Sequence, residues 1–520
     1  MIFQKKTRQL ALILLCGAVV CASASAQAPA DRNKLPPGAI ARMGQLGDKE
    51  AAGIYHVCFS PDGKTLATRD RDQTIRLWDV AAGRQLCKLF GEELRITDVS
   101  FSPDGKRLAT GGAREGVSLW DTQTGKRLKT LGKDAWKVRF SADGKTLRVA
   151  GHSRFYQSQL PTGELIKRPR EVLPSAMLPQ AFSPDGKRLA ATRRTHAEEI
   201  DLRDTSSGSI VRTLKGLETG PTSVAFSPDG RFLAVSCRRR EAIKVWDLND
   251  KKNTLLYNLR GHEEPVQAVV FSPDGRFLVS ASWDKTLRLW ELETGQEIAV
   301  VTGHREHVCA VAFSPDGRRL ASSASGRRDS TALVWDTAVI SAPRPADVKR
   351  IDAEALEQQW NALASDKAVE AYAAIGAMVA VAERSVPLLA SKLEPTLRQA
   401  NAQRIKALIL QLDSDRFAER ERATVELKKL RPASDGLLQK TLAETKSPEV
   451  KLRIETILKG KIPPSKLSAS ERRRTLRLIY ALELIADKLS RELLEGISTR
   501  FPNGPIADVA NKSLARLGAQ

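Results

Sequence analysis

Seven copies of one pentapeptide constrain this chain of 520 residues more than any other feature. Successive copies begin about forty residues apart, a period typical of repeat architectures in which one unit cannot bury its apolar face alone. We therefore expect seven copies of one small unit, closed into a ring. Phe-Ser-Pro-Asp-Gly begins at Phe59, Phe101, Phe182, Phe226, Phe271 and Phe313, and the variant Phe-Ser-Ala-Asp-Gly begins at Phe140.

Each repeat predicts four short strands. An apolar run such as residues 308–313 leads into Ser-Pro-Asp-Gly, which favours a tight turn because Pro presets φ, Asp bonds nearby backbone and Gly accepts a left-handed conformation. A second strand follows, then a third that ends in Trp, as in residues 286–290. A Thr-Gly turn such as Thr294-Gly295 and a fourth strand complete the unit. Four strands in this length are typical of one propeller blade.

Dipeptides at fixed places in these repeats indicate a family. The chain resembles the WD-repeat (WD40) family over residues 38–340, and this resemblance implies an all-β, seven-bladed propeller. The motifs that carry the resemblance are Trp78-Asp79, Trp120-Asp121, Trp246-Asp247, Trp335-Asp336, the related Trp290-Glu291, and the Gly-His pairs Gly261-His262 and Gly303-His304.

The resemblance also implies a hydrogen-bonded tetrad within a blade, which the sixth repeat matches with His262, Ser282, Asp284 and Trp290. We interpret these residues as structural. The other blades depart from the pattern: Ser158 and Arg203 replace Trp in the third and fourth, and Arg327 stands at the Ser position of the seventh. Substitutions of Ser158 and Arg203 are therefore expected to matter little.

The ring is expected to close through its N-terminus. The seventh repeat lacks a fourth strand, because Ser341-Ala342-Pro343-Arg344-Pro345 cannot pair inside a sheet. Residues 39–43 form a spare strand-like run ahead of the first pentapeptide. Pairing this run with the last blade would remove an open sheet edge.

The first 26 residues predict a secretory signal peptide. Lys5, Lys6 and Arg8 precede an apolar run over residues 10–20, and Ala24-Ser25-Ala26 is a typical cleavage site. We expect an exported chain, periplasmic or extracellular, with a linker over residues 27–37 and no membrane span after cleavage.

Four cysteines remain after the signal peptide: Cys58, Cys87, Cys237 and Cys309. Their spacings match no zinc pattern, and three of them lie in apolar strands, where cysteine commonly acts as a small hydrophobic residue. Whether Cys58 and Cys309, on the first strands of neighbouring blades, form a disulfide stays open.

The composition changes after Pro343 and Pro345. Residues 341–350 predict a Pro-rich linker and residues 351–520 an all-α domain, because Ala, Leu, Glu, Lys and Arg now recur at helical spacing. Internal similarity at an offset of 49 aligns Ser365-Asp366-Lys367 with Ser414-Asp415-Arg416. This similarity resembles HEAT-like helical hairpins, with an irregular helical bundle as the alternative.

Charge and motifs together favour binding over catalysis. No catalytic motif, metal-ligand spacing or cofactor fingerprint is found, so we predict no catalytic, metal or cofactor residues. The function expected is a non-catalytic exported scaffold that contacts proteins or the cell envelope through the propeller face and the helical domain. The alternative is a hydrolase or lyase, or a carbohydrate-binding protein, that uses residues of the propeller channel.

The net charge of +22 makes an anionic envelope component a second candidate partner, whereas export argues against nucleic acid. The family geometry implies that the loops between second and third strands share one face of the disc. These loops carry the candidate partner-binding residues Arg193, Arg194, Arg238, Arg239, Arg240, Arg327 and Arg328.

Overall fold

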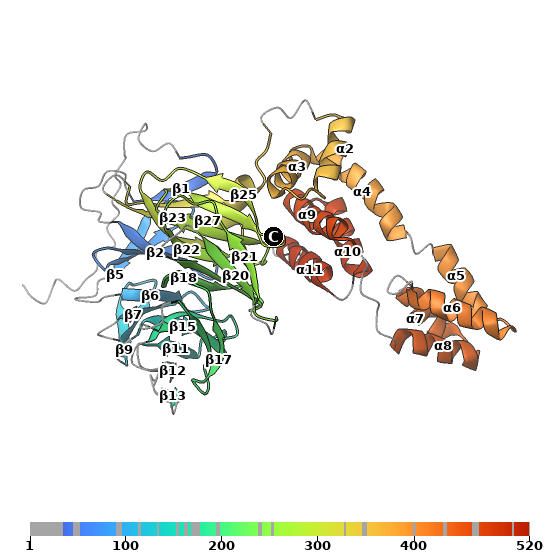
Figure 1. Ribbon diagram of the computed structural model, residues 1–520, viewed down its shortest axis with the longest axis horizontal. Helices are drawn as coiled ribbons and strands as arrows, with labels where there is room; N and C mark the ends of the chain where they lie inside the picture. Colours follow the sequence, from blue (N-terminus) through green and yellow to red (C-terminus); the bar gives the residue numbers. More distant parts are fainter. Residues whose placement is uncertain are drawn as a thin grey trace, which may run out of the picture. The chain divides into compact units, whose positions relative to one another are not determined.

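A computed structural model describes most of the chain (Figure 1). The chain divides into two compact units, residues 1–340 and 341–520, each described below by itself. The described residues are 35–44, 53–89, 96–112, 116–132, 135–151, 155–160, 165–167, 177–193, 198–237, 242–250, 254–326, 329–345, 351–398, 402–429, 434–459, 467–501 and 504–518.

The first unit consists of seven antiparallel sheets of four strands each. Blades one to three are β2 to β5 (Ile54–Phe59, Thr65–Asp70, Ile75–Asp79, Gln85–Leu89), β6 to β9 (Ile96–Phe101, Arg107–Gly112, Gly116–Asp121, Arg127–Leu131) and β10 to β13 (Lys137–Phe140, Thr146–Ala150, Phe155–Gln159, Leu165–Lys167). Blades four and five are β14 to β17 (Met177–Phe182, Arg188–Arg193, Ile200–Asp204, Ile210–Leu214) and β18 to β21 (Pro221–Phe226, Phe232–Cys237, Ile243–Asp247, Leu255–Leu259). Blade six is β22 to β25 (Val266–Phe271, Phe277–Ser282, Leu287–Glu291, Gln296–Val301), and blade seven is β26 to β28 (His307–Phe313, Arg319–Ser325, Ala332–Asp336) with β1 (Ala39–Met43).

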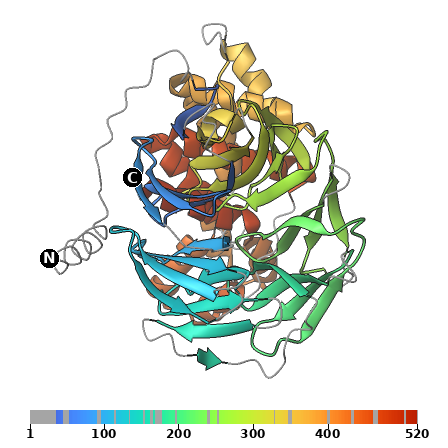
Figure 2. The same cartoon turned by 90° about the vertical axis from the view of Figure 1, so that its left-hand side faces the viewer.

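The blades form a closed ring around their first strands. Each first strand contacts the first strand of the next blade, from β2 through β6, β10, β14, β18 and β22 to β26 and back to β2. Figure 2 shows the sheets following one another around this ring. The seven-bladed β-propeller predicted from the repeats is therefore confirmed.

The pentapeptide forms the same turn in every blade. The Ser hydroxyl donates to Oδ1 of the Asp at 2.5–2.6 Å, and that oxygen also accepts the backbone N–H that follows the Gly at 2.9–3.1 Å. The Gly residues have φ between +66° and +76°, where a side chain would be strained. Ser141 and Asp143 make the same bonds although Ala142 replaces Pro, so the Ser–Asp pair and the Gly define the turn.

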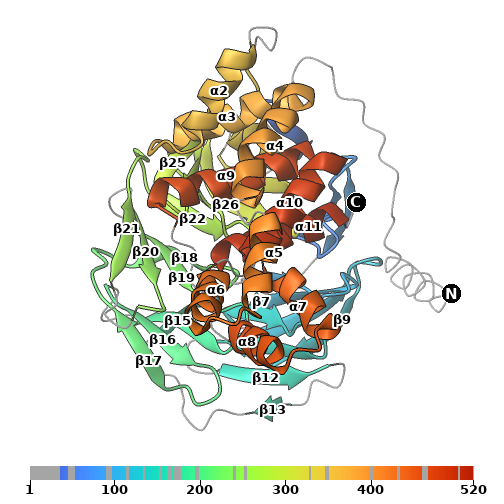
Figure 3. The ribbon, with the colours of Figure 1, turned by 90° about the vertical axis from the view of Figure 1, so that its right-hand side faces the viewer.

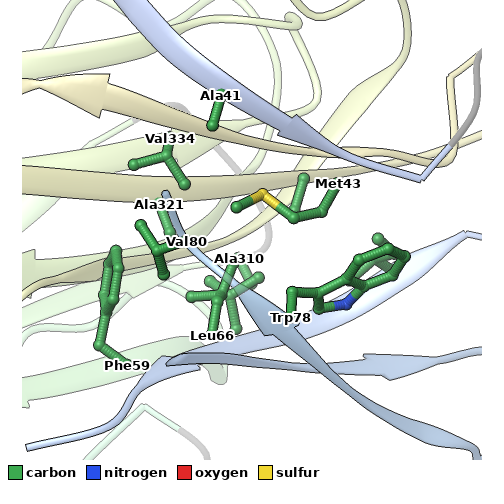
Figure 4. Packing of buried hydrophobic residues seen from close by; sticks show 12 residues of the cluster. Ala41, Met43, Phe59, Leu66, Trp78, Val80, Ala310, Ala321 and Val334 are labelled. Carbon is green, nitrogen blue, oxygen red and sulfur yellow. The ribbon is translucent and has the colours of Figure 1, made fainter. Parts of the chain in front are cut away.

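The N-terminal strand completes the last blade. β1 pairs antiparallel with β28, with Ala39 opposite Trp335 and Met43 opposite Ala332. Met43 is fully buried. In Figure 4, Met43 and Ala41 lie in an apolar cluster with residues of the first and seventh blades. The closure expected from the spare run ahead of the first pentapeptide is therefore present.

The second unit is helical, as predicted. The short helix α1 (Thr337–Ser341) leads into it, and its end is anchored where the Ser341 and Tyr480 hydroxyl groups lie 2.8 Å apart. The other helices are α2 (Ala353–Ala362), α3 (Ala368–Ala380), α4 (Ala382–Arg398), α5 (Ala402–Gln411), α6 (Phe417–Lys429), α7 (Asp435–Glu444), α8 (Pro448–Lys459), α9 (Ala469–Ile485), α10 (Lys488–Arg500) and α11 (Pro505–Gly518).

The similarity at an offset of 49 reflects a structural duplication. The bounds of α5 and α6 follow those of α2 and α3 by 49 residues at both ends. Ser365 bonds Glu370 ahead of α3, and Ser414 bonds Glu419 in the same way ahead of α6. The third set of helices does not extend a linear array, because α9 packs on α3 and α10 on α4, while α5 to α8 share their own core (Figure 3).

The segment expected to be a Pro-rich linker is packed in the part that the structure describes. Ala342 is buried, and a Cβ at Gly376 of α3 would lie 2.2 Å from the carbonyl oxygen of Pro343. Only glycine therefore fits where α3 passes this segment. Among the described helices, none alone is long and apolar enough to cross a membrane, and only the sharply bent pair α3 and α4 reaches that length and composition together.

Candidate functional site

The sixth blade contains a complete chain of buried hydrogen bonds. Asp284 Oδ2 lies 2.7 Å from His262 Nδ1, His262 Nε2 lies 2.7 Å from Ser280 Oγ, and Trp290 Nε1 donates to Ser280 Oγ at 2.9 Å. An ionised carboxylate only accepts, so Nδ1 donates to Asp284 and Nε2 accepts the Ser280 hydroxyl.

The serine of this tetrad is Ser280, and the prediction of Ser282 was wrong. Ser282 lies one pleat further along β23, where its hydroxyl donates to the carbonyl of Glu264 at 2.8 Å. Ser280 stands ten residues before Trp290 and opposite Arg288, within reach of the indole. The same spacing joins Thr68 to Trp78 and Thr110 to Trp120, both at 3.0 Å, in the first two blades.

The seventh blade contains a second tetrad that the sequence reading missed. His304 Nδ1 lies 3.0 Å from Asp329 Oδ2, His304 Nε2 lies 2.7 Å from Ser322 Oγ, and Trp335 Nε1 donates to Ser322 at 2.8 Å. The placement of Arg327 at the Ser position was wrong, because three extra residues lie between Ser322 and Asp329. The signal that survives this insertion is the spacing of 18 residues from His to Ser in both blades.

Both tetrads have the Ser-His-Asp order of hydrolase triads, but neither is accessible to a substrate. Ser280 and Ser322 are completely buried, and each hydroxyl already accepts an indole N–H. A nucleophilic hydroxyl must reach a reacting carbon. These side chains therefore hold the second and third strands of their blades to the loop that precedes the first strand.

Acid is expected to weaken the propeller through these carboxylates. Burial opposes ionisation of Asp329, but bonds from His304 and Thr331 outweigh it and lower its pKa to about 2. A carboxylate with a depressed pKa stabilises the fold above its ordinary pKa near 4, and this stabilisation is lost as the pH falls through the folded value. We expect Asp329 to contribute roughly 2–3 kcal/mol that disappears between about pH 4 and pH 2.

The measurement is the unfolding free energy from pH 7 to pH 2, followed by tryptophan fluorescence. Asp329→Asn should lower stability at pH 7 and flatten the fall below pH 4. Asp415→Asn, at an exposed position of the helical unit, should leave the curve unchanged. If the unfolding free energy of Asp329→Asn fell below pH 4 as steeply as that of the parent, Asp329 would not be the source of the acid sensitivity.

The two degenerate blades fill the Trp position differently. Ser158 pairs with Leu147 and Arg203 with Leu189, as Trp290 pairs with Leu278, so the alignment of these positions is correct. Arg203 is buried, donates to the carbonyl of Gly208 at 2.8 Å and lies 3.4 Å from Asp201. The expectation that Arg203 matters little is therefore not supported, because its loss would leave Asp201 buried beside a void.

Most of the predicted basic site cannot be placed. Arg194, Arg238, Arg239, Arg240, Arg327 and Arg328 lie outside the described residues, and for Arg193 only the backbone at the end of β15 is described. The faces of the disc are nevertheless defined, because strands alternate in direction within each antiparallel sheet. The loops between second and third strands and the starts of the first strands share one end, here called the loop face.

A strip on the loop face combines three exposed side chains with two half-buried ones. Trp283, His307 and Tyr55 are exposed, Arg69 and Cys309 are half-buried, and the five residues come from blades six, seven and one. The rings of Trp283 and His307 are 5.3 Å apart, and His307 Nδ1 lies 2.7 Å from the carbonyl oxygen of Trp283. The Arg69 guanidinium lies 5.8 Å from the centre of the Tyr55 ring. Trp283 is 39% and Tyr55 37% exposed, unusually high for large aromatic side chains.

Charged groups line the inner wall of the first three blades. His56 Nε2 lies 3.7 Å and Lys137 Nζ 3.3 Å from Asp98 Oδ1, while Asp98 Oδ2 accepts the backbone N–H of Val138. Burial lowers the pKa of His56 to about 4 although Asp98 opposes the shift, so this imidazole is neutral at pH 7.

Cysteine and metal chemistry find no support among the described residues. The structure contains four free thiols, at Cys58, Cys87, Cys237 and Cys309. It therefore has no disulfide between Cys58 and Cys309. Burial raises the pKa of Cys58 to about 12 and that of Cys309 to about 11, which keeps both protonated. Within the described ranges, no three His, Cys, Asp or Glu side chains converge as metal ligands.

Comparison with known families agrees with this architecture. The family model described as WD domain, G-beta repeat, matches residues 44–79, 83–121, 208–247, 253–291 and 295–336. The matches cover the blades whose third strand carries Trp, and they omit the third and fourth blades, where Ser158 and Arg203 stand instead. No curated protein matches the chain. Together with the seven sheets and the two tetrads, these matches show that the chain contains five WD40 repeats within a seven-bladed propeller.

Proposed function

We propose that this chain is an exported, non-catalytic scaffold that binds a protein partner through the strip on the loop face. Propellers of WD40 repeats commonly serve as protein-interaction scaffolds. The observation that carries the assignment to this face is the accessible Trp283, whose ring is tilted against that of His307 on the same face as the Arg69–Tyr55 pair.

The strip has the composition of an interface centre. Trp, Tyr and Arg are enriched among the residues that supply most of the binding energy in protein interfaces. Trp and Tyr bury large areas and have only two rotatable side-chain bonds to order. Trp283 is already held by the backbone bond from its N–H to Pro265 O, and His307 is held against its carbonyl. This order before binding reduces the entropic cost of association.

Export is supported by the basic, apolar and small-residue regions of residues 1–26, which lie outside the described residues. Cell fractionation of the natural chain and of a variant lacking residues 2–26 tests this part. If the natural chain stayed in the cytoplasm, the proposed export would be wrong, whereas the proposed binding through the strip would still stand.

Partner binding is tested with purified mature chain carrying an affinity tag, used to capture proteins from the native envelope fraction. We expect Trp283→Ala and Tyr55→Ala to lose the same captured proteins, with at least tenfold weaker binding once a partner is isolated, a typical loss at an interface anchor. Leu128→Ala is the matched control, because Leu128 is an exposed apolar residue on the outer strand of blade two. Equal capture by all four chains would place the interface elsewhere.

A further inference from the structure

Two arginines occupy an unusual place in the third blade. Arg139 on β10 and Arg148 on β11 are cross-strand partners, and such partners share a face of the sheet. In the first blade the equivalent residues, Cys58 and Ala67, pack against the second blade. Arg139 and Arg148 therefore face the fourth blade. The other blades have Cys58, Ser100, Ala181, Ala225, Val270 and Ala312 in place of Arg139, and Ala67, Ala109, Ala190, Ala234, Val279 and Ala321 in place of Arg148.

Among the described side chains, the seam between blades three and four is poor in apolar contacts. Its cluster of described residues contains only Ala150, Phe182, Leu189 and Ala191. The seam between blades two and three, by contrast, is filled by Leu119, Phe140, Leu147, Tyr156 and seven other apolar residues. The arginines therefore stand where apolar packing holds the other blades together.

Among the described residues, Asp98 attracts the Arg139 guanidinium without forming an ion pair with it. Neither Arg139 nor Arg148 forms an ion pair within the described ranges, and the nearby Asp98 is engaged by Lys137 and by the backbone of Val138. The Arg148 guanidinium lies against Gly186 in the pentapeptide turn of blade four, where a Cβ would collide with it. The Arg148 guanidinium therefore reaches across the seam to blade four.

The Arg139 guanidinium is influenced by charged neighbours on two blades. Its side chain is exposed, yet burial lowers its pKa, with Asp98 opposing this effect and Arg148 adding to it. Two neighbouring guanidinium groups that repel each other favour an anion between them.

We propose that Arg139 and Arg148 form a binding site for a small oxyanion at the seam between blades three and four. Each guanidinium presents paired N–H donors that match two oxygens of a phosphate or carboxylate group. The bound anion would bridge β10 and β11 to blade four and stabilise the closed ring. This site is independent of the partner face, because it lies toward the pentapeptide turns.

The test is titration calorimetry of the mature chain with inorganic phosphate, and separately with malonate, in chloride buffer at constant ionic strength. We expect saturable binding of at least one anion to the parent chain. Arg139→Ala and Arg148→Ala should each weaken it roughly tenfold or more, the usual effect of losing a hydrogen bond between charged groups. Arg84→Ala, on an exposed turn of blade one, should bind as the parent does.

Thermal unfolding of the same chains gives the second readout. The anion should raise the melting temperature of the parent and of Arg84→Ala more than that of Arg148→Ala. Arg148→Ala is expected to fold, because five other blades have Ala at this position. Arg148→Lys keeps the charge without the paired donors and should bind with intermediate strength. Saturable binding of malonate alone would support the site with a carboxylate as occupant. No saturable binding, or an equal rise in all variants from general salt effects, would overturn it.

Discussion

A variant lacking residues 38–44 is expected to unfold under conditions in which the parent propeller is fully folded. The deletion removes β1, so β28 loses its backbone partner and the seventh blade becomes an open edge. It also removes Met43, which is fully buried between the first and seventh blades. Loss of one buried Met side chain alone costs about 2–5 kcal/mol, and the lost backbone pairing adds to this.

Denaturant unfolding followed by tryptophan fluorescence measures this effect, since seven of the eight tryptophans lie between Trp78 and Trp335. A deletion of equal length upstream, residues 28–34, is the control and should leave the transition unchanged. If the variant lacking residues 38–44 unfolded at the parent's denaturant concentration, ring closure would not depend on β1.

Replacing Trp290 by Ala should destabilise the propeller by roughly 3–5 kcal/mol, the usual cost of truncating a buried aromatic side chain. The indole fills the cluster between blades five and six, and its N–H is the donor that completes the tetrad at Ser280. Its removal therefore creates a cavity and takes away the N–H donor of the buried Ser280 hydroxyl.

Two companion variants separate these contributions. Trp290→Phe keeps most of the ring volume and removes the N–H, so it should cost less than Trp290→Ala. Trp283→Ala is the matched control, because it removes an accessible tryptophan from the same blade and should change stability by less than about 1 kcal/mol. A loss at Trp283 as large as that at Trp290 would contradict the buried role of the tetrad.

Turn chemistry made the architecture predictable. Each pentapeptide satisfies its own Ser, Asp and Gly within five residues, so the turns, the period and the blade count followed from local sequence. Closure was predictable for a similar reason: Pro343 and Pro345 exclude a strand after β28, and residues 39–43 remain to fill the edge.

The tetrads were harder to predict because they depend on register. Ser280 and Ser282 lie on the same face of β23 and differ only by one pleat, and only the ten-residue spacing shared with Thr68–Trp78 and Thr110–Trp120 selects Ser280. In the seventh blade, the loop before Asp329 is longer, which moves Ser322 to thirteen residues before Trp335. The number of residues from His to Ser is the same in both blades, because the first strand and the turn between them contain no insertion.

The candidate interaction strip was missed for a different reason. Trp283 looks like one more core tryptophan, but it follows β23 in a loop instead of ending a third strand. Tyr55 and Cys309 lie at β-bulges of β2 and β26, and a bulge turns a residue out of the alternation that periodicity relies on. Only the folded ring brings residues of blades six, seven and one together.

Because the first strand pairs with the last, the ring can close only late in biosynthesis. Met43 cannot pair with its partner Ala332 until that residue, 289 positions later in the chain, has been synthesised. At ~5–20 residues per second, synthesis takes roughly 15 to 60 s to cover that distance. During this interval β1 has no native partner and can pair with wrong strands, and a chain that stops before β28 (Ala332–Asp336) lacks the strand with which β1 pairs. Factors that shield nascent strands should therefore matter for the yield of this protein more than for its final stability.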